Sequence, residues 1–350
     1  MKKVSIIFLI AVSFIVLWLY GLTYSGEVEQ NECFFQKSLH YTTRGMAYWY
    51  DKNNGGLETI TDIPYAELKC KNCHISSCDV CHKNEINNKL SYSTDTAKNN
   101  EKCLKCHKRA GAVIKKDKKL NQLDVHFAKG MQCTDCHTAR ELHGDGTEYD
   151  SMRQIGAMDV KCENCHESVP SSISHKIHRA KLDCNSCHVR HVVSCSNCHF
   201  DTLVKEGKKV AIPLSDWVFL INYEGKITSA NMQTFVVSKN KTFILFAPQN
   251  SHSVMKEGRK CNECHGIDNV KKVQSGNIDL IWLENGKINN IKGVIPIVDG
   301  VTYNCVYQDY KDGKWIPIEN PQTPLLQYAG YGKPLTKIQL KKLAMPVGKR

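Results

Sequence analysis

The sequence predicts a mainly α-helical and irregular fold with a small β-rich section towards its C-terminus. A five-residue unit with two cysteines recurs between residues 70 and 265. Few apolar runs in residues 70–210 exceed three residues, so side chains alone offer little burial to offset the entropy lost on folding. After residue 205, apolar, β-branched and aromatic runs separated by turn-forming residues are typical of strands.

The chain of 350 residues divides into three expected parts. We expect residues 1–25 to be a signal peptide or an N-terminal membrane anchor. Residues 26–205 should form an elongated body that contains seven of the recurring units. Residues 206–350 should form the β-rich section, which contains the eighth unit and ends in a surface helix near Pro334 to Leu343.

The N-terminus has the pattern of an export signal. Lys2 and Lys3 precede an uncharged apolar stretch from Val4 to Leu22. This stretch is longer than the usual core of a signal peptide and just long enough to span a bilayer. A cleaved signal and an uncleaved anchor at residues 4–22 therefore remain alternatives. Both place the rest of the chain in the periplasm or cell envelope, because the positive charges lie on the N-terminal side.

The recurring unit consists of two cysteines separated by two residues and followed by a histidine. It uses sixteen of the 18 cysteines, although only 15 residues of the chain are histidine. Zinc binding would need the pairs to associate in twos, and a redox dithiol would explain one pair rather than eight. Covalent haem explains both spacing and recurrence, because the cysteines form thioethers with the haem vinyl groups and the histidine becomes the proximal iron ligand. The predicted attachment sites are Cys70, Cys73 and His74; Cys78, Cys81 and His82; Cys103, Cys106 and His107; Cys133, Cys136 and His137; Cys162, Cys165 and His166; Cys184, Cys187 and His188; Cys195, Cys198 and His199; and Cys261, Cys264 and His265.

By these motifs the chain resembles the multihaem c-type cytochromes over residues 70–265. The resemblance implies eight covalent haem c groups, whose flat apolar rings would fill the core. The number of motifs, the segment CHTARELHGDG at residues 136–146 and the Gly-Arg-Lys-Cys sequence before the last motif are similar to the octahaem cytochromes related to tetrathionate reductase and hydroxylamine oxidoreductase. All eight motifs end in histidine, unlike the lysine-terminated motif of the pentahaem nitrite reductases.

Seven histidines outside the motifs are the expected distal iron ligands, namely His40, His126, His143, His175, His178, His191 and His252. Eight irons and seven such histidines leave at least one iron without a distal histidine from this chain. Several groups could provide the sixth ligand of that iron. One is a lysine, as in the catalytic haem of the tetrathionate reductase that the chain resembles. Others are a histidine of a neighbouring subunit, or a water that a substrate can displace. A methionine is the fourth alternative, with candidates Met46, Met131, Met152 and Met158.

The formal charge of +12 taken alone suggests an anionic partner. Eight haems would add about sixteen propionates and about one positive charge per oxidised iron, which brings the total to about −4 when reduced and about +4 when oxidised. The basic residues then act as counter-ions, and no nucleic-acid binding is expected. The two cysteines outside the motifs, Cys33 and Cys305, predict a disulfide in an oxidising compartment, with two thiols or an intermolecular bridge as alternatives.

Seven motifs within residues 70–199 bring neighbouring haems close together, which predicts electron transfer along a chain of haems. Redox proteins or a membrane complex that oxidises quinol are the expected partners. Two alternatives remain open. The iron without a distal histidine could reduce a small sulfur or nitrogen oxyanion, or the chain could be one subunit of a polymeric cytochrome wire, which would make it a homo-oligomer. No catalytic side chain is predicted.

Overall fold

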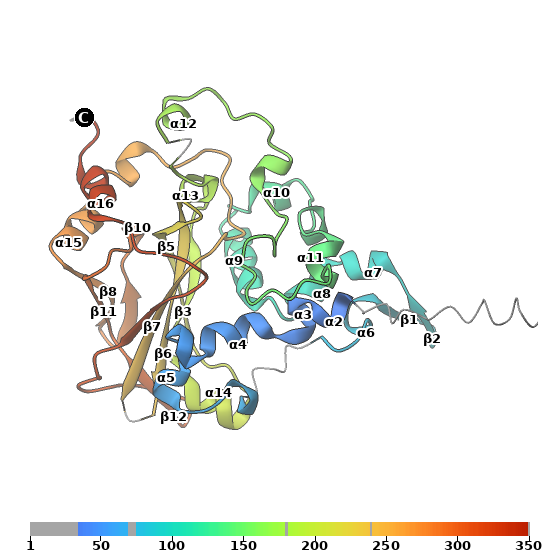
Figure 1. The fold of residues 1–350 in the computed structure, drawn as a ribbon. Helices are drawn as coiled ribbons and strands as arrows, with labels where there is room; N and C mark the ends of the chain where they lie inside the picture. The colour runs from blue at the N-terminus through green and yellow to red at the C-terminus, as the bar shows by residue number, and fades with distance from the viewer. Residues whose placement is uncertain (1–33, 69–74, 179–180, 239, 349–350) are drawn as a thin grey trace, which may run out of the picture.

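The computed structural model describes residues 34–68, 75–178, 181–238 and 240–348 (Figure 1). The apolar stretch Val4–Leu22, Cys33 and the first motif at residues 70–74 lie outside these ranges. The membrane anchor and the disulfide between Cys33 and Cys305 therefore remain predictions. Within the described ranges, no helix combines the length and the apolar character that crossing a bilayer requires.

Short helices and turns carry most of the motifs. Apart from α9, which has twelve residues, these helices are four to seven residues long. Their bounds are α2 (Phe34–Lys37), α3 (Leu39–Thr42), α4 (Arg44–Tyr50), α5 (Glu58–Thr61), α6 (Asp79–His82), α7 (Thr94–Lys98), α8 (Asn100–Leu104), α9 (Lys108–Lys119), α10 (Val125–Ala128), α11 (Ala139–His143), α12 (Ile173–His178) and α13 (Cys184–His188). Single 3₁₀ turns complete this part at η1 (Lys52–Asn54), η2 (Tyr65–Glu67), η4 (Cys133–Asp135), η5 (Cys162–Asn164) and η6 (Cys261–Glu263).

A seven-stranded sheet forms the centre of the molecule. Its main path is β10-β5-β6-β7-β14, and β3 and β4 pair with β5 and β6 respectively. The strands are β3 (Val192–Ser196), β4 (Cys198–His199), β5 (Ile212–Tyr223), β6 (Lys226–Val237), β7 (Lys241–Pro248), β10 (Gly293–Pro296) and β14 (Leu325–Tyr328). Figure 1 shows helices α8 to α11 on one side of this sheet, and α15 (Asp268–Gln274) and α16 (Lys337–Ala344) on the other. Helix α14 (Phe200–Glu206) follows β4 at one end of the sheet.

Smaller sheets surround the central one. They are β8 (Asn277–Glu284) with β9 (Lys287–Asn290) and β11 (Thr302–Cys305); β12 (Gln308–Lys311) with β13 (Lys314–Pro317); and β1 (Lys83–Ile86) with β2 (Lys89–Tyr92). The Asn285-Gly286 turn joins β8 to β9 with positive φ angles of 50° and 71°, as a two-residue hairpin turn requires. The Asp299-Gly300 turn is present, but β10 and β11 on either side of it pair with different strands.

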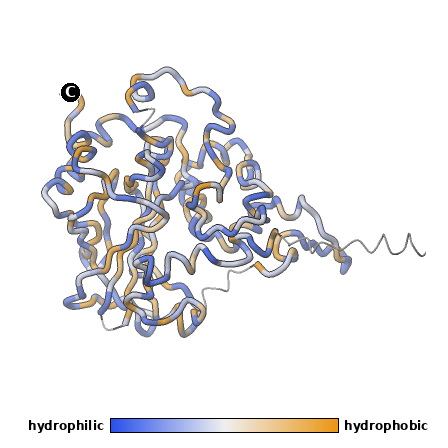
Figure 2. Tube along the Cα trace, viewed as in Figure 1, coloured by the Kyte–Doolittle hydropathy of each residue, from blue (hydrophilic) through white to orange (hydrophobic). Residues whose placement is uncertain are grey.

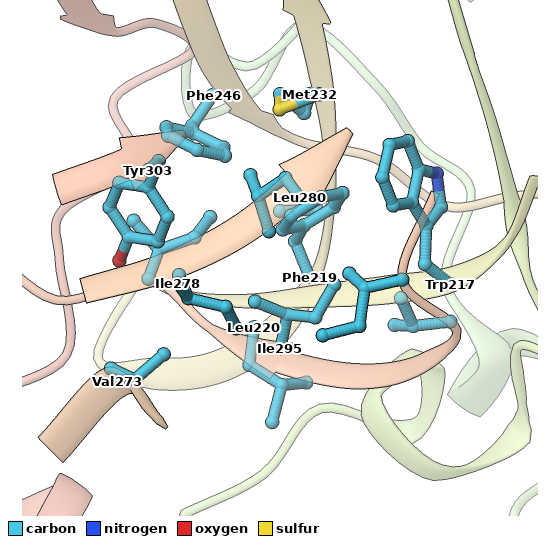
Figure 3. Close-up of a cluster of buried hydrophobic side chains, with 14 of the residues drawn as sticks. Trp217, Phe219, Leu220, Met232, Phe246, Val273, Ile278, Leu280, Ile295 and Tyr303 are labelled. Atoms are coloured by element: carbon cyan, nitrogen blue, oxygen red, sulfur yellow. The ribbon is translucent and has the colours of Figure 1, made fainter. Parts of the chain in front are cut away.

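Most of the buried apolar side chains belong to the sheet and the elements that cover it. Trp217, Phe219, Phe246 and Leu280 are completely buried, and Figure 3 shows them packed together with Met232 and Tyr303. Each such side chain contributes about 1.5–3 kcal/mol of burial free energy. Figure 2 shows apolar residues following these strands, whereas the part that carries the motifs alternates between polar and apolar residues. The sheet is therefore the rigid support on which the motif-bearing segments are arranged.

The expectation of a mainly α-helical fold with a small β section was wrong. Helices and 3₁₀ turns account for 33% of the residues that the structure describes and strands for 28%, in several sheets. Two physical reasons explain the difference. The strands β5 and β6 have twelve residues each. β5 continues beyond its apolar run at residues 217–221, and the centre of β6 contains polar residues such as Thr228, Asn231 and Thr234, so no apolar run marks it as a strand. Residues 192–199, which the motif pattern assigned to the irregular body, are β-branched and polar residues that enter the same sheet.

Candidate haem centres

Six motifs share one backbone conformation. In five of them the histidine N–H donates a hydrogen bond to the carbonyl of the first cysteine, four residues earlier, at 2.9–3.0 Å; these are His82, His107, His137, His166 and His265. The sixth motif, Cys184–His188, is itself helix α13. One helical turn places residues i, i+3 and i+4 on the same face. Both thiols and the imidazole of each motif can therefore reach the same haem, as thioether attachment and proximal ligation require.

Each of these six motif histidines faces a histidine from outside the motifs. The distances between ring centroids are 5.9 to 6.4 Å, although the partners are 13 to 115 residues apart in the sequence. The pairs are His40 with His107, His82 with His143, His126 with His166, His137 with His252, His175 with His188 and His178 with His265.

This separation fits one iron between two imidazoles. A metal midway between the rings would lie about 3 Å from each centroid and about 2 Å from the nearest ring nitrogen, the usual length of an imidazole–metal bond. Rings in direct stacking contact would be closer together. In the part of the chain that the structure describes, no three His, Cys, Asp or Glu side chains gather around a common point, so these pairs do not form ordinary metal clusters. The residues present fit bis-histidine haem.

Hydrogen bonds to the other ring nitrogen hold these histidines in position. Nδ1 of His143 donates to the carbonyl of Ala139 at 2.9 Å, and Nδ1 of His178 donates to that of Ser174 at 3.0 Å. Nδ1 of His188 donates to the carbonyl of Met255 at 3.1 Å. Similar bonds from Nδ1 fix His82, His175 and His265. This pattern fixes the tautomer and leaves Nε2 for a metal, as is usual for metal-binding histidines.

Two carboxylates accept hydrogen bonds from the Nδ1 of ligand histidines, and neither was predicted from the sequence. Nδ1 of His137 donates to Glu141 at 2.8 Å, and Nδ1 of His126 donates to Asp124 at 3.1 Å. Burial raises the pKa of Glu141, but the bonds from His137 and from the amides of Val160 and Asp159 outweigh it, and the net pKa is lowered. Their spacing was the available signal, because residues i+4 on a helix and i−2 at its N-cap lie next to the histidine.

Burial keeps several of these imidazoles neutral. It is the main cause that lowers the pKa of His40, His107 and His252, and neighbouring motif histidines lower it further. A neutral imidazole has the lone pair that ligation needs. The buried pairs are therefore ready to bind a metal at neutral pH.

The six motifs form a chain in space. The Cys103 thiol lies beside that of Cys133, and the Cys162 thiol beside that of Cys184. Burial and then neighbouring Cys103 raise the pKa of Cys81, and burial and then neighbouring Cys165 raise that of Cys136. Burial and then Cys187 raise the pKa of Cys264 to about 12. The motifs at residues 78–82, 103–107, 133–137, 162–166, 184–188 and 261–265 therefore follow one another, each next to the one before.

The seventh motif does not join this arrangement. Its histidine, His199, donates from Nε2 to Asp309 at 2.7 Å, and its backbone N–H bonds to Val210 instead of Cys195. The remaining predicted distal ligand, His191, donates from Nε2 to the buried Asp117 at 2.8 Å and faces no motif histidine among the described residues. The pairing of His191 with a motif stays a prediction, because its Nδ1 is buried without a hydrogen-bond partner and the first motif lies outside the described residues. Of the methionine candidates, Met46 and Met152 have exposed side chains.

Comparison with known proteins gives one partial similarity. Residues of this chain are 25% identical, over 168 aligned residues, to dissimilatory sulfite reductase MccA from Wolinella succinogenes. The alignment covers 37% of this chain and 23% of that protein, so the chain spans less than a quarter of its relative's length. No family model matches the chain, and no solved structure matches it. Together with the six histidine pairs, the similarity supports a multihaem redox protein in coarse terms and does not establish the number of haems.

Proposed function

We propose that this chain is a multihaem c-type cytochrome that transfers electrons along closely spaced bis-histidine haems in the periplasm or cell envelope. The observation that carries the proposal is the six facing histidine pairs, each with one member from an attachment motif. Haem supplies reversible one-electron chemistry when bound, and two imidazole ligands favour electron transfer over substrate binding.

The positions of the motif cysteines set the order in which electrons would pass between the haems. Neighbouring motif cysteines mark a path from residues 78–82 to residues 261–265, along which the bound haems would follow one another. Electron tunnelling falls steeply with distance, so contact between edges gives rapid transfer. The first motif at residues 70–74 lies outside the described residues and is a further expected site. Redox proteins or a quinol-oxidising membrane complex are the proposed partners.

Reduction of a sulfur or nitrogen oxyanion is the second candidate function. The similarity to a dissimilatory sulfite reductase favours it, and so does the ligand arithmetic. Six of the seven histidines outside the motifs face a described motif, and His191 bonds to Asp117. Only His191 remains for His74, and its Nε2 is already bonded to Asp117, so that Nδ1 alone could serve as a ligand. If a neighbouring subunit supplied the distal ligand of the iron bound through His74, the polymeric wire would be favoured instead.

Reoxidation of the fully reduced holoprotein distinguishes these functions. An electron carrier should be reoxidised by ferricyanide and remain reduced in the presence of sulfite, nitrite or tetrathionate. Oxidation by one of these anions, with consumption of the anion in proportion to the electrons lost, would establish the reductase instead. Size-exclusion chromatography with light scattering on the same sample would identify a polymeric wire.

A further inference from the structure

The motif at residues 195–199 has a conformation that differs from the six described above. Cys195 lies in β3 and Cys198 in β4, and Asn197 between them has a left-handed φ of 51°. The chain is therefore extended on both sides of a kink rather than wound into one helical turn. In an extended strand, successive side chains point to opposite faces. The two thiols and the imidazole consequently lack the common face that thioether attachment needs.

The sheet encloses this motif. Cys195 and Ser196 pair with β5 at Pro213 and Ile212, and Cys198 and His199 pair with β6 at Phe235 and Val236. Ser194, Ser196 and Asn197 are fully buried, and only 1% of Cys198 is exposed. In five of the six paired motifs, by contrast, at least one cysteine is exposed, which leaves room for a large ring beside it; in the sixth, Cys184 and Cys187 are half-buried, and neither is buried as completely as Cys198.

Side-chain hydrogen bonds connect the motif to the sheet. The hydroxyl of Ser194 donates to Asn231 at 2.6 Å and accepts from the indole of Trp217 at 3.0 Å. The amide of Asn197 donates to Thr234 at 2.8 Å. Turning residues 195–199 into a helical turn would break these bonds and leave buried polar groups unsatisfied, at about 1–3 kcal/mol for each group.

The histidine of this motif is also engaged differently. His199 uses Nε2, the nitrogen that remains for a metal in the other motifs, to donate to Asp309, and Nδ1 accepts from the amide of Thr202 at 3.4 Å. A cavity of about 410 Å³ lies beside His199 and Asp309, but neither Cys195 nor Cys198 lines it. A haem in that cavity could therefore not be bonded to the two cysteines. His191, four residues before Cys195, donates from Nε2 to Asp117.

We infer that residues 195–199 do not attach haem, and that Cys195 and Cys198, within the central sheet, form no thioether bonds. The pentapeptide instead has a structural role, in which His199 and Asp309 connect β4 to the β12–β13 hairpin. The chain then carries at most seven haems rather than eight. The inference rests on the proposed function in one respect, because it assumes that the other motifs do carry haem.

Adjacent tryptic peptides test the inference with an internal control. Cleavage after Lys181, Arg190 and Lys205 separates residues 182–190, which contain Cys184–His188, from residues 191–205, which contain Cys195–His199. The purified holoprotein is denatured, alkylated, digested and analysed by mass spectrometry. We expect haem on peptide 182–190 and two alkyl groups, or a disulfide, on peptide 191–205. Haem on both peptides would overturn the inference, and haem on neither would instead contradict the proposed function.

Variants extend the test to the intact chain. Replacing both Cys195 and Cys198 with serine should leave the number of haems, measured by intact mass, unchanged. The matched double variant Cys184→Ser with Cys187→Ser should lose one haem. Loss of one haem from the first variant would overturn the inference. If either variant fails to accumulate, the peptide map of the wild-type protein still decides.

Discussion

His175 and His188 face each other with ring centroids 6.3 Å apart and ring planes only 10° from parallel. His175 belongs to α12 and His188 to a motif, so the pair has the arrangement of a distal and a proximal iron ligand. Replacing His175 with alanine should therefore leave one iron five-coordinate and high-spin, which electron paramagnetic resonance of the oxidised protein would detect.

The matched control for this variant is His191→Gln. His191 also lies outside the motifs, but it donates to Asp117, and an amide can keep that bond. We expect its spectrum to match the wild type. A high-spin iron in His191→Gln would show that His191 is a ligand after all.

Helix α12 should control two irons at once. His178 lies three positions after His175, and it faces His265 with a centroid distance of 6.1 Å. Replacing Lys176 with proline removes the hydrogen bond from its N–H to Ser172 and costs about 3 kcal/mol. Two irons should lose their low-spin signal together, whereas Lys176→Ala should leave both intact. Loss of only one signal in the proline variant would show that the two ligands are positioned independently.

Glu141 should lower the reduction potential of the haem bound through His137. Its carboxylate accepts from His137 at 2.8 Å and stabilises the more positive, oxidised iron. In Glu141→Gln, losing about 1.4 kcal/mol of this stabilisation would raise one midpoint potential by about 60 mV in a spectroelectrochemical titration. The exposed Glu148, which bonds to Arg44 instead of a histidine, provides a control of the same charge change in Glu148→Gln. An unchanged or lower potential in Glu141→Gln would contradict this role.

Acid should loosen the loop that follows α11. A backbone hydrogen bond from Thr147, and then Arg140, lower the pKa of Asp145 to about 2; Arg140 and then Thr138 lower that of Asp159. Both folded pKa values lie below the ordinary value of 3.8, so the stability they provide is complete above about pH 4 and is lost as the pH falls towards 2. Amide hydrogen exchange of residues 138–160 should therefore lose protection in that window. The Arg140→Gln variant should start with lower protection and depend less on pH; equal acid sensitivity in both proteins would contradict the assignment.

Candidate attachment motifs can be identified from the sequence alone, whereas the fold around them was predicted wrongly. The spacing of cysteines and histidine follows from covalent chemistry, so it marks a candidate motif without knowledge of the fold. The strands around Trp217 and Phe243 and the turn at Asn285-Gly286 were also predictable, because they depend on neighbouring residues. Which histidine faces which motif depends on contacts between distant residues, as the 115 residues between His137 and His252 illustrate. No local pattern contains that information.

The fold also overrides the motif pattern at one place. Residues 195–199 have the same five-residue pattern as the others, yet Val192 and Val193 lead into a strand that pairs with β5. The competing signal was local β propensity before the motif and two hydroxyl side chains. Ser194, just before the motif, bonds to Asn231, and Ser196, within it, bonds to Thr234. Asp309, which bonds to His199, is 110 residues away and could not be associated with it from the sequence.

Low-temperature electron paramagnetic resonance of the oxidised holoprotein, with haem content fixed by pyridine haemochrome, tests the central claim most directly. Six facing histidine pairs predict at least six low-spin irons per chain, and a high-spin signal of no more than one iron, expected at the motif of residues 70–74 if no neighbouring subunit completes it. Fewer than six low-spin irons, or several high-spin irons that bind cyanide, would contradict the bis-histidine electron-transfer chain.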